Sequence, residues 1–216
     1  MLRVGQSLEA EEEKAYNRVF EQGEVPEAGK IPVKVLHGES NGVYISLKRE
    51  QQKKTEVRVG ILYTGKKAIA EGRKRLENKV VVTKIVENSQ EWQETQLKVA
   101  YENYDLDNIT RMITGGDGGR GEHQSFDYLD LPREFVLDRF HLYRDARRAF
   151  GFYAQADAWI FKIRTEGLES VLPDMLTALS KAPHAQTKRM RRLIEYFVNN
   201  REGLLDPDCR AHLQPG

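Results

Sequence analysis

Residues 39–47 read ESNGVYISL, and the fold class follows from this stretch and its neighbours. Apolar side chains recur at every second position from Val43 onward, which is the pattern of a half-buried β-strand. The same period of two returns in residues 56–63, and residues 79–86 form a third, more continuously apolar run. Polar connections separate the runs, as in an antiparallel meander. We therefore expect three strands, the first over residues 33–47.

Helix and strand alternate in the next part of the chain, and its last part is helical. We expect Ser89 to cap a helix that runs to about Tyr104, with Trp92 and Ala100 in the core, and then strands over residues 111–114 and 134–137. The order β-β-β-α-β-β is that of the RNase H-like fold, one of several α/β arrangements that fit these patterns. The elements predicted after it are a basic helix that follows residues 138–142 and ends at Phe150, and helices over residues 154–165, 168–181 and 187–200.

Three regions follow from these patterns. Ser7 can cap a first helix over residues 7–22, and a linker containing proline and glycine completes an N-terminal region over residues 1–32. An incomplete RNase H-like core is expected over residues 33–150, and a helical insertion over residues 151–216. Thr64, Gly65 and Lys66 are typical of a turn after the second strand.

The composition is that of a globular protein, with 39% hydrophobic and 31% charged residues. Lys and Arg (34) nearly balance Asp and Glu (33), so net charge alone predicts no nucleic-acid partner. The one cysteine, Cys209, excludes an internal disulfide and a cysteine-rich zinc site. No apolar run approaches the roughly 18 residues that a membrane span needs. We therefore expect a cytoplasmic protein with no membrane partner.

Asp117 is the clearest candidate for a catalytic, metal-binding residue. It follows an apolar strand within the segment GGDGG, residues 115–119, where glycines permit a tight turn and the close approach of a phosphate. Nucleases that use two divalent metals need hard oxygen ligands held on rigid strands. The alternative is an Asp-Gly turn with no ligand role.

Glu39 and Asn41 are a second candidate pair, on the first strand. Residues two apart in a strand point to the same side, so both would share a core-facing row with Val43. A carboxylate in such a row is costly unless it binds a metal or a hydrogen-bond donor. Alternatively, Glu39 is solvated at a frayed strand start. Asp138 and His141 could support a metal or phosphate site, although the histidine could equally be packed or cap a helix.

Two basic clusters in the C-terminal half are candidate DNA-binding faces, because such clusters neutralise phosphates. The spacing of the first can line one side of a helix. The alternative for each is an ordinary solvated helix face. The clusters are Arg139, Arg144, Arg147 and Arg148, and then Lys188, Arg189, Arg191 and Arg192.

Several segments together resemble the transposases of ISLre-type bacterial insertion sequences. The resemblance runs from about residue 22 to residue 216 and rests on the order and spacing of the segments. They are residues 39–50 (ESNGVYISLKRE), residues 55–60 (TEVRVG) with Tyr63 and Gly65, residues 116–118 (GDG), residues 137–142 (LDRFHL), and Tyr196 with residues 199–203 (NNREG).

The resemblance implies a DDE/D transposase that uses Mg²⁺ or Mn²⁺, with an RNase H-like core and a helical insertion before its last acid. Where the family pattern is Glu-x-Asp-Gly, this chain has Asn41, and an amide is a poorer ligand for a divalent metal than a carboxylate. The last acid, a Glu, is expected beyond Gly216, and the family's N-terminal DNA-binding region would precede this sequence. We therefore expect a truncated, catalytically impaired fragment in which Asp117 remains.

Three functional hypotheses follow. A transposase fragment would bind DNA at transposon ends and associate with a second copy of itself or with a full-length transposase. A non-catalytic DNA-binding or transposition-regulating protein is the alternative, and salt-sensitive DNA binding without cleavage would favour it. A third hypothesis is an active nuclease that uses Glu39, Asp117 and Asp138, which requires their oxygens to converge.

Overall fold

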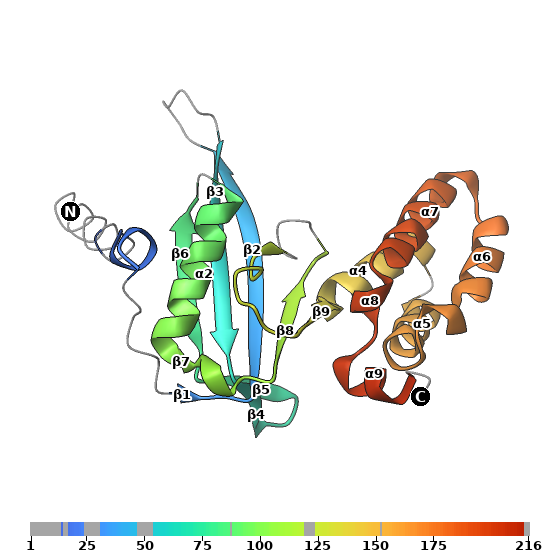
Figure 1. Ribbon diagram of the computed structural model, residues 1–216. Coiled ribbons are helices and arrows are strands. Elements are labelled where there is room, and N and C mark those ends of the chain that lie inside the picture. Colours follow the sequence, from blue (N-terminus) through green and yellow to red (C-terminus); the bar gives the residue numbers. More distant parts are fainter. Residues whose placement is uncertain are drawn as a thin grey trace.

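A mixed sheet of five strands forms one side of the protein, and a group of helices forms the other (Figure 1). The computed structural model describes residues 14, 17–23, 31–46, 54–86, 88–118, 124–151 and 153–213. The strands of the sheet, in spatial order, are β6 (Val80–Ile85), β3 (Lys54–Tyr63), β2 (Val35–Ser46), β8 (Arg111–Gly116) and β9 (Arg133–Leu137). The predicted α/β fold class is confirmed.

The strand directions agree with the predicted order of elements. β2, β3 and β6 are antiparallel to one another in succession, and β8 and β9 run parallel to β2. Helix α2 (Ser89–Asn103) lies between β6 and β8 in the chain. Glu39 pairs with Gly115 across β2 and β8, and Gly116 pairs with Leu137 across β8 and β9. The carboxyl end of β8 therefore lies between two neighbouring strands.

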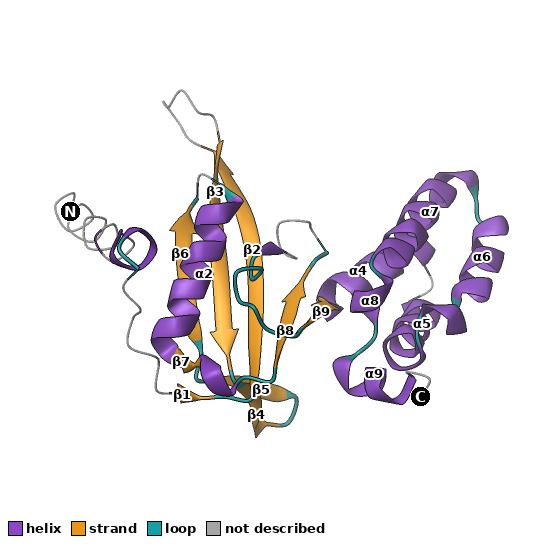
Figure 2. Ribbon diagram, viewed as in Figure 1, coloured by secondary structure: helices purple, strands orange, loops and turns teal. Residues whose placement is uncertain are grey.

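Helix α2 covers one face of the sheet (Figure 2). On this face Ser40 of β2 is buried and accepts a hydrogen bond from Trp92 Nε1 at 3.0 Å. The predicted core residues Trp92 and Ala100 are fully buried. The cap of α2 is Asn88, whose side chain accepts from Glu91 N, and not Ser89 as predicted. An asparagine side-chain carbonyl caps a helix by accepting from an orphan N–H of the first turn, as a serine hydroxyl does.

The opposite face of the sheet corrects one prediction. Val43 and Ile45 of β2, with Val81 and Ile85 of β6, have between 41% and 60% of their surface exposed. The row that contains Asn41 and Val43 therefore faces solvent in β2 and not the core. The buried positions of β2 are the alternate ones, where Trp92 of α2 bonds to Ser40 and the ring of Phe126 packs on Gly38. The period of two predicted the strand correctly, but it could not tell which side would be covered.

A second β-hairpin between β3 and β6 was not predicted. Strands β4 (Gly65–Ala70) and β5 (Arg73–Glu77) pair with each other in antiparallel fashion. Of the turn predicted at residues 64–66, only Thr64 is a bend, and Gly65 and Lys66 belong to β4. The hairpin lacks apolar alternation, which is why the sequence pattern gave no strand there. Two short strands, β1 (Ile31–Pro32) and β7 (Tyr104–Asp105), pair in parallel at the lower edge of the view in Figure 1.

The helical part confirms the predicted helices and adds short ones. Its helices are α4 (Arg139–Phe150), α5 (Tyr153–Glu166), α6 (Leu172–Ser180), α7 (His184–Asn199), α8 (Arg201–Leu204) and α9 (Pro207–Leu213), with a 3-10 turn, η3 (Leu168–Ser170), before α6. Phe150, Ile160, Ile163, Met175 and Phe197 form the centre of their common core, each 1% exposed or less. α8 packs against β9, and Arg210 of α9 forms an ion pair with Glu134 of β9.

The remaining predictions concern the N-terminal region and the boundaries. Of the helix predicted over residues 7–22, the structure describes residues 14 and 17–22, where Asn17–Glu21 form a π-helical turn, η1. The rest of that helix lies outside the described residues, as do Leu47 and Gly119. The three predicted regions stay a prediction. None of the helices described combines the length and apolar character that crossing a bilayer requires.

Candidate functional site

Asp117 lies one residue beyond the carboxyl end of β8, where the sheet meets the helical part. The hydroxyl of Tyr196, on α7, donates to the carbonyl oxygen of Asp117 at 2.6 Å. Gly118 follows with a φ of 86°, and a Cβ at this position would lie 2.9 Å from Asn200 Oδ1. A left-handed conformation and this close approach both favour glycine. The glycine turn that the sequence pointed to is therefore held by α7.

An open pocket of about 650 Å³ lies beside Asp117. Its walls come from α4 and α7. Each helix contributes residues that are three or four positions apart and therefore lie on one side of the helix. Four of the lining residues are arginines, two from each helix. The lining is Asp117, His141, Arg144, Asp145, Arg148, Ala149, Arg189, Arg192, Leu193 and Tyr196.

The pocket arginines differ in their partners. Arg144 forms a bidentate pair with Asp145 at 2.8 and 3.0 Å, and this hydrogen bonding raises the pKa of the guanidinium. Arg189 Nη1 donates to the backbone oxygen of Arg148 at 3.0 Å, which joins α7 to α4. Among the residues that the structure describes, Arg192 has no acidic partner within 4.0 Å. The pocket thus holds more cationic than anionic charge and suits an anionic group.

The other predicted basic residues lie outside the pocket. Arg147 makes a bidentate pair with Asp157 at 2.7 and 2.6 Å, which lowers the pKa of that carboxyl. Arg139 pairs with Asp206 at 3.2 Å. Lys188 and Arg191 are exposed on α7 away from the lining. Of the two predicted clusters, only Arg144, Arg148, Arg189 and Arg192 are therefore brought to one site.

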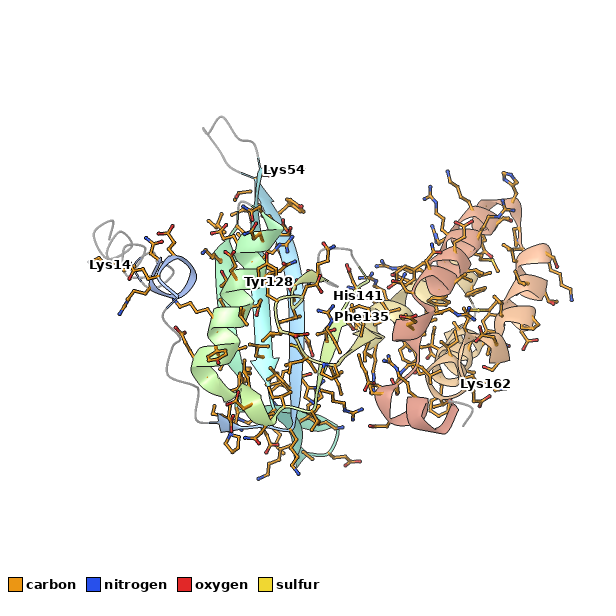
Figure 3. All side chains as sticks on the ribbon, in the orientation of Figure 1. Lys14, Lys54, Tyr128, Phe135, His141 and Lys162 are labelled. Carbon is orange, nitrogen blue, oxygen red and sulfur yellow. The ribbon has the colours of Figure 1, made fainter. Side chains whose placement is uncertain are left out.

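Asp138 and His141 belong to the junction between β9 and α4, where Figure 3 labels His141. Asp138 caps α4, because its Oδ1 accepts from Phe140 N at 2.7 Å. His141 Nδ1 lies 3.3 Å from Asp138 Oδ2, but this contact lacks hydrogen-bond geometry and leaves the buried nitrogen unbonded. Asp138 is thus a capping residue, and His141 is part of the pocket wall.

Glu39 and Asn41 lie on β2 and do not line the pocket. Glu39 Oε1 accepts from Tyr63 Oη at 2.9 Å and lies 3.9 Å from Lys66 Nζ, so its carboxylate is neither buried alone nor merely solvated. Burial and the carboxylate of Glu39 raise the pKa of Tyr63, which keeps the phenol a donor. Asn41 is exposed and pairs with Val59 of β3.

The acidic residues that the structure describes do not form a metal site of three ligands. Within the described parts of the chain, no group of three His, Cys, Asp or Glu side chains is placed to hold one metal ion. Glu39 is engaged with Tyr63 and Lys66, whereas Asp138 caps α4. The hypothesis of an active nuclease that uses Glu39, Asp117 and Asp138 requires a convergence that these residues do not show.

His37, beside Glu39, gives a prediction for pH dependence. Its ring stacks on Tyr63 with centroids 4.8 Å apart, and burial with the nearby charges of Lys66 and Arg111 lowers its pKa below the ordinary 6.5, against the opposing charge of Glu39. Because the pKa of His37 is lower in the folded state than in the unfolded state, the unfolded chain binds a proton more readily as the pH falls below 6.5. The stability present above pH 6.5 is therefore lost as the pH falls.

His37→Phe keeps the stacked ring and removes the titration. We expect the free energy of unfolding to fall less steeply below pH 6.5 in this variant than in the wild type. Urea unfolding at intervals from pH 5 to pH 8 measures the difference. Two parallel profiles would show that His37 is not linked to stability.

Comparison with known proteins places the chain in a family. A family model described as "Uncharacterised protein family (UPF0236)" matches residues 6–214. The chain is a member of UPF0236. No curated protein matches this UPF0236 chain.

One solved structure that is similar to the UPF0236 chain is a cryo-EM structure of the simian T-cell lymphotropic virus intasome in complex with PP2A regulatory subunit B56 gamma. The identity is 11%, and the match covers 59% of the UPF0236 chain and 43% of that chain. The UPF0236 chain thus corresponds to less than half of its neighbour's length. The TM-score of 0.27 is too low to carry a structural argument.

Sequence reasoning missed two site residues of the UPF0236 chain. Tyr196 anchors the turn at Asp117, and Asp145 balances Arg144 in the pocket wall. The spacing of four residues from Arg192 to Tyr196 is a signal that could have placed both on one side of α7. Nothing in the local sequence predicts that the tyrosine reaches Asp117, because the hydrogen bond joins residues far apart in the chain.

Proposed function

We propose that this UPF0236 protein is an insertion-sequence transposase chain with an RNase H-like sheet, which binds DNA and whose cleavage chemistry is impaired. The observation that carries the proposal is the pocket that joins four arginines of α4 and α7 to the glycine turn of Asp117. Three antiparallel strands followed by two parallel ones support the RNase H-like part. The ISLre-type segments support the transposase part.

The pocket suits a DNA phosphate for chemical reasons. Arginine presents a planar fork of donors that matches a phosphate, and it stays charged at every physiological pH. Arg148 and Arg192 are exposed on different helices and line the same space, so one phosphate group can meet both walls. Interactions of this kind fix the position of a duplex without reading its sequence. We infer that transposon-end DNA is the partner, with a second copy of the chain or a full-length transposase as a protein partner.

The incomplete set of metal ligands distinguishes the proposed protein from an active transposase. Mg²⁺ or Mn²⁺ would be held by carboxylates of β2 and of the turn after β8, where Asp117 lies. Asn41 offers a neutral amide where the family pattern has an Asp, and the described residues hold no group of three ligands. The residues present do not fit a two-metal site, so we derive no cleavage step and assign the protein to DNA binding.

DNA binding is tested with a double variant of the pocket. Arg148→Ala with Arg192→Ala is expected to weaken duplex binding about tenfold or more at moderate salt. The slope of log K against log salt should fall by about 0.9 for each phosphate that the variant no longer neutralises. Fluorescence anisotropy with a labelled duplex measures both. The matched control is Lys188→Ala with Arg191→Ala, which removes the same charge from exposed positions outside the pocket.

The control variant is expected to change the affinity much less than the pocket variant. Equal losses would mean that net charge alone decides binding, and the pocket would have no special role. Absence of salt-sensitive binding by the wild type would overturn the proposed function itself.

Cleavage is tested separately. We expect no nicking of supercoiled DNA with Mg²⁺ or Mn²⁺, and Asn41→Asp alone is not expected to restore it, because a single added carboxylate does not complete the ligand set. Robust Mn²⁺-dependent nicking that disappears in Asp117→Ala would falsify the impaired-site proposal. Binding without nicking would favour a regulatory role, in which the protein occupies transposon ends.

A further inference from the structure

The hairpin of β4 and β5 carries an unusual density of positive charge. Residues 65–77 read GKKAIAEGRKRLE and contain five basic and two acidic side chains, in a protein whose net charge is only +1. The basic residues are all exposed. They are Lys66, Lys67, Arg73, Lys74 and Arg75. A positive density of this kind is electrostatically complementary to a partner of opposite charge.

The pairing of the two strands sets like charges against each other. Lys67 lies directly opposite Arg75 in the register, and Lys74 lies opposite Ala68. Like charges at directly opposed positions destabilise a β-ribbon. Of the five cations only Lys66 has an acid within 4.0 Å in the described part of the chain, namely Glu39 at 3.9 Å. The opposed pair Lys67 and Arg75 is therefore expected to cost folding stability, and a bound polyanion would offset that cost.

The backbone gives the hairpin a defined shape. The strands are joined at Glu71 and Gly72, and Gly72 has a φ of 66° with open space around its Cα. The ribbon projects at the lower end of the sheet in Figure 1, apart from α4 and α7. It is therefore a surface separate from the arginine pocket. At its root, Lys66 lies over the ring of Tyr63 at 5.3 Å, which fixes the hairpin to β3.

We propose that the β4–β5 hairpin is a second binding surface for duplex DNA. A two-stranded ribbon fits the major groove, which is about 12 Å wide, and its cations reach the phosphates on both sides. Lysine and arginine side chains from both strands would then face a row of DNA phosphates. A single bound anion would contact fewer of these side chains. The inference rests on the proposed function insofar as DNA is the partner, but it concerns a surface that the proposed function does not use.

The experiment compares two variants of the full chain. The hairpin variant carries Lys67→Gln, Lys74→Gln and Arg75→Gln, and the pocket variant is Arg148→Ala with Arg192→Ala. We expect the hairpin variant to bind a duplex of about 30 base pairs roughly tenfold or more weakly, with a salt slope reduced by about 0.9 for each phosphate no longer neutralised. We expect its thermal midpoint to stay the same or rise, because the opposed like charges are gone. Glu71→Gln, which removes an acid from the same hairpin, is the matched control and should not weaken binding.

Lysine acetylation of the wild-type protein gives an independent readout. Bound duplex should shield Lys67 and Lys74 more than the exposed Lys181 of the helical part. A hairpin variant that binds like the wild type, while the pocket variant loses affinity, overturns this inference and leaves the proposed function standing. No duplex binding by the wild type overturns both. Hairpin-dependent binding to polyglutamate or anionic vesicles but not to duplex also overturns the inference, because the partner would then be another polyanion.

Discussion

Trp92→Ala is expected to lower the free energy of unfolding by about 3–5 kcal/mol, the usual range for removing a fully buried large aromatic. Trp92 is 0% exposed between α2 and the sheet. Its Nε1 donates to Ser40 Oγ at 3.0 Å, and Ser125 Oγ donates to the same atom at 2.9 Å. The variant would leave a large cavity and a buried serine with one partner fewer.

Urea unfolding followed by circular dichroism measures this change. Trp92→Phe is the control, because it keeps most of the ring volume and removes the hydrogen bond, worth about 1 kcal/mol. Its loss should be well below that of Trp92→Ala. A loss under about 1 kcal/mol in Trp92→Ala would show that α2 does not pack on the sheet as described.

Phe197→Ala is expected to have a similar effect, about 3–5 kcal/mol, in the helical part. Phe197 is 0% exposed on α7 and lies in the core cluster of the helices. α7 also carries Arg189, Arg192 and Tyr196, so displacement of this helix should weaken duplex binding as well. Stability is measured by urea unfolding and binding by anisotropy under conditions where the variant remains folded.

Val198→Ala is the matched control on the same helix, because Val198 is 45% exposed beside Phe197. A substitution at an exposed position is expected to change stability by no more than about 0.5 kcal/mol. If both variants lost the same stability, α7 would not bury the face that the structure assigns to it. If Phe197→Ala bound duplex normally while folded, the pocket would not depend on the seating of α7.

The sequence predicted the elements whose side chains repeat with a clear period. β2 and β3 were found because their residues alternate, and α4 and α7 because apolar and basic residues recur at helical spacing. The β4–β5 hairpin has no such period, since Lys67 and Arg75 occupy opposed positions where a strand pattern would place apolar residues. The buried side of β2 was assigned wrongly for a related reason, because period alone does not say on which face a helix will pack.

The sequence predicted several residues of the candidate site, but it did not predict which of them lie together. The Asp117 turn and the basic clusters carry local signals in glycine content and charge. Which arginines meet depends on how α4 crosses α7, and that crossing is decided by buried residues such as Phe150 and Phe197. Arg147 pairs with Asp157 of α5 and does not line the pocket. Tertiary packing therefore decides which arginines line the pocket, and the spacing of residues in the sequence does not predict it.

The hydrogen bond from Tyr196 to the carbonyl oxygen of Asp117 limits how this sequence can change in length. One residue added to α7 between Arg192 and Tyr196 would turn the arginines by about 100° about the helix axis relative to the tyrosine. The basic wall and the turn of Asp117 would then no longer share one side of α7. An added residue in the connection at 181–183 leaves that spacing intact. We therefore expect related sequences to vary in length between α6 and α7 and to keep a fixed count from Arg189 to Tyr196.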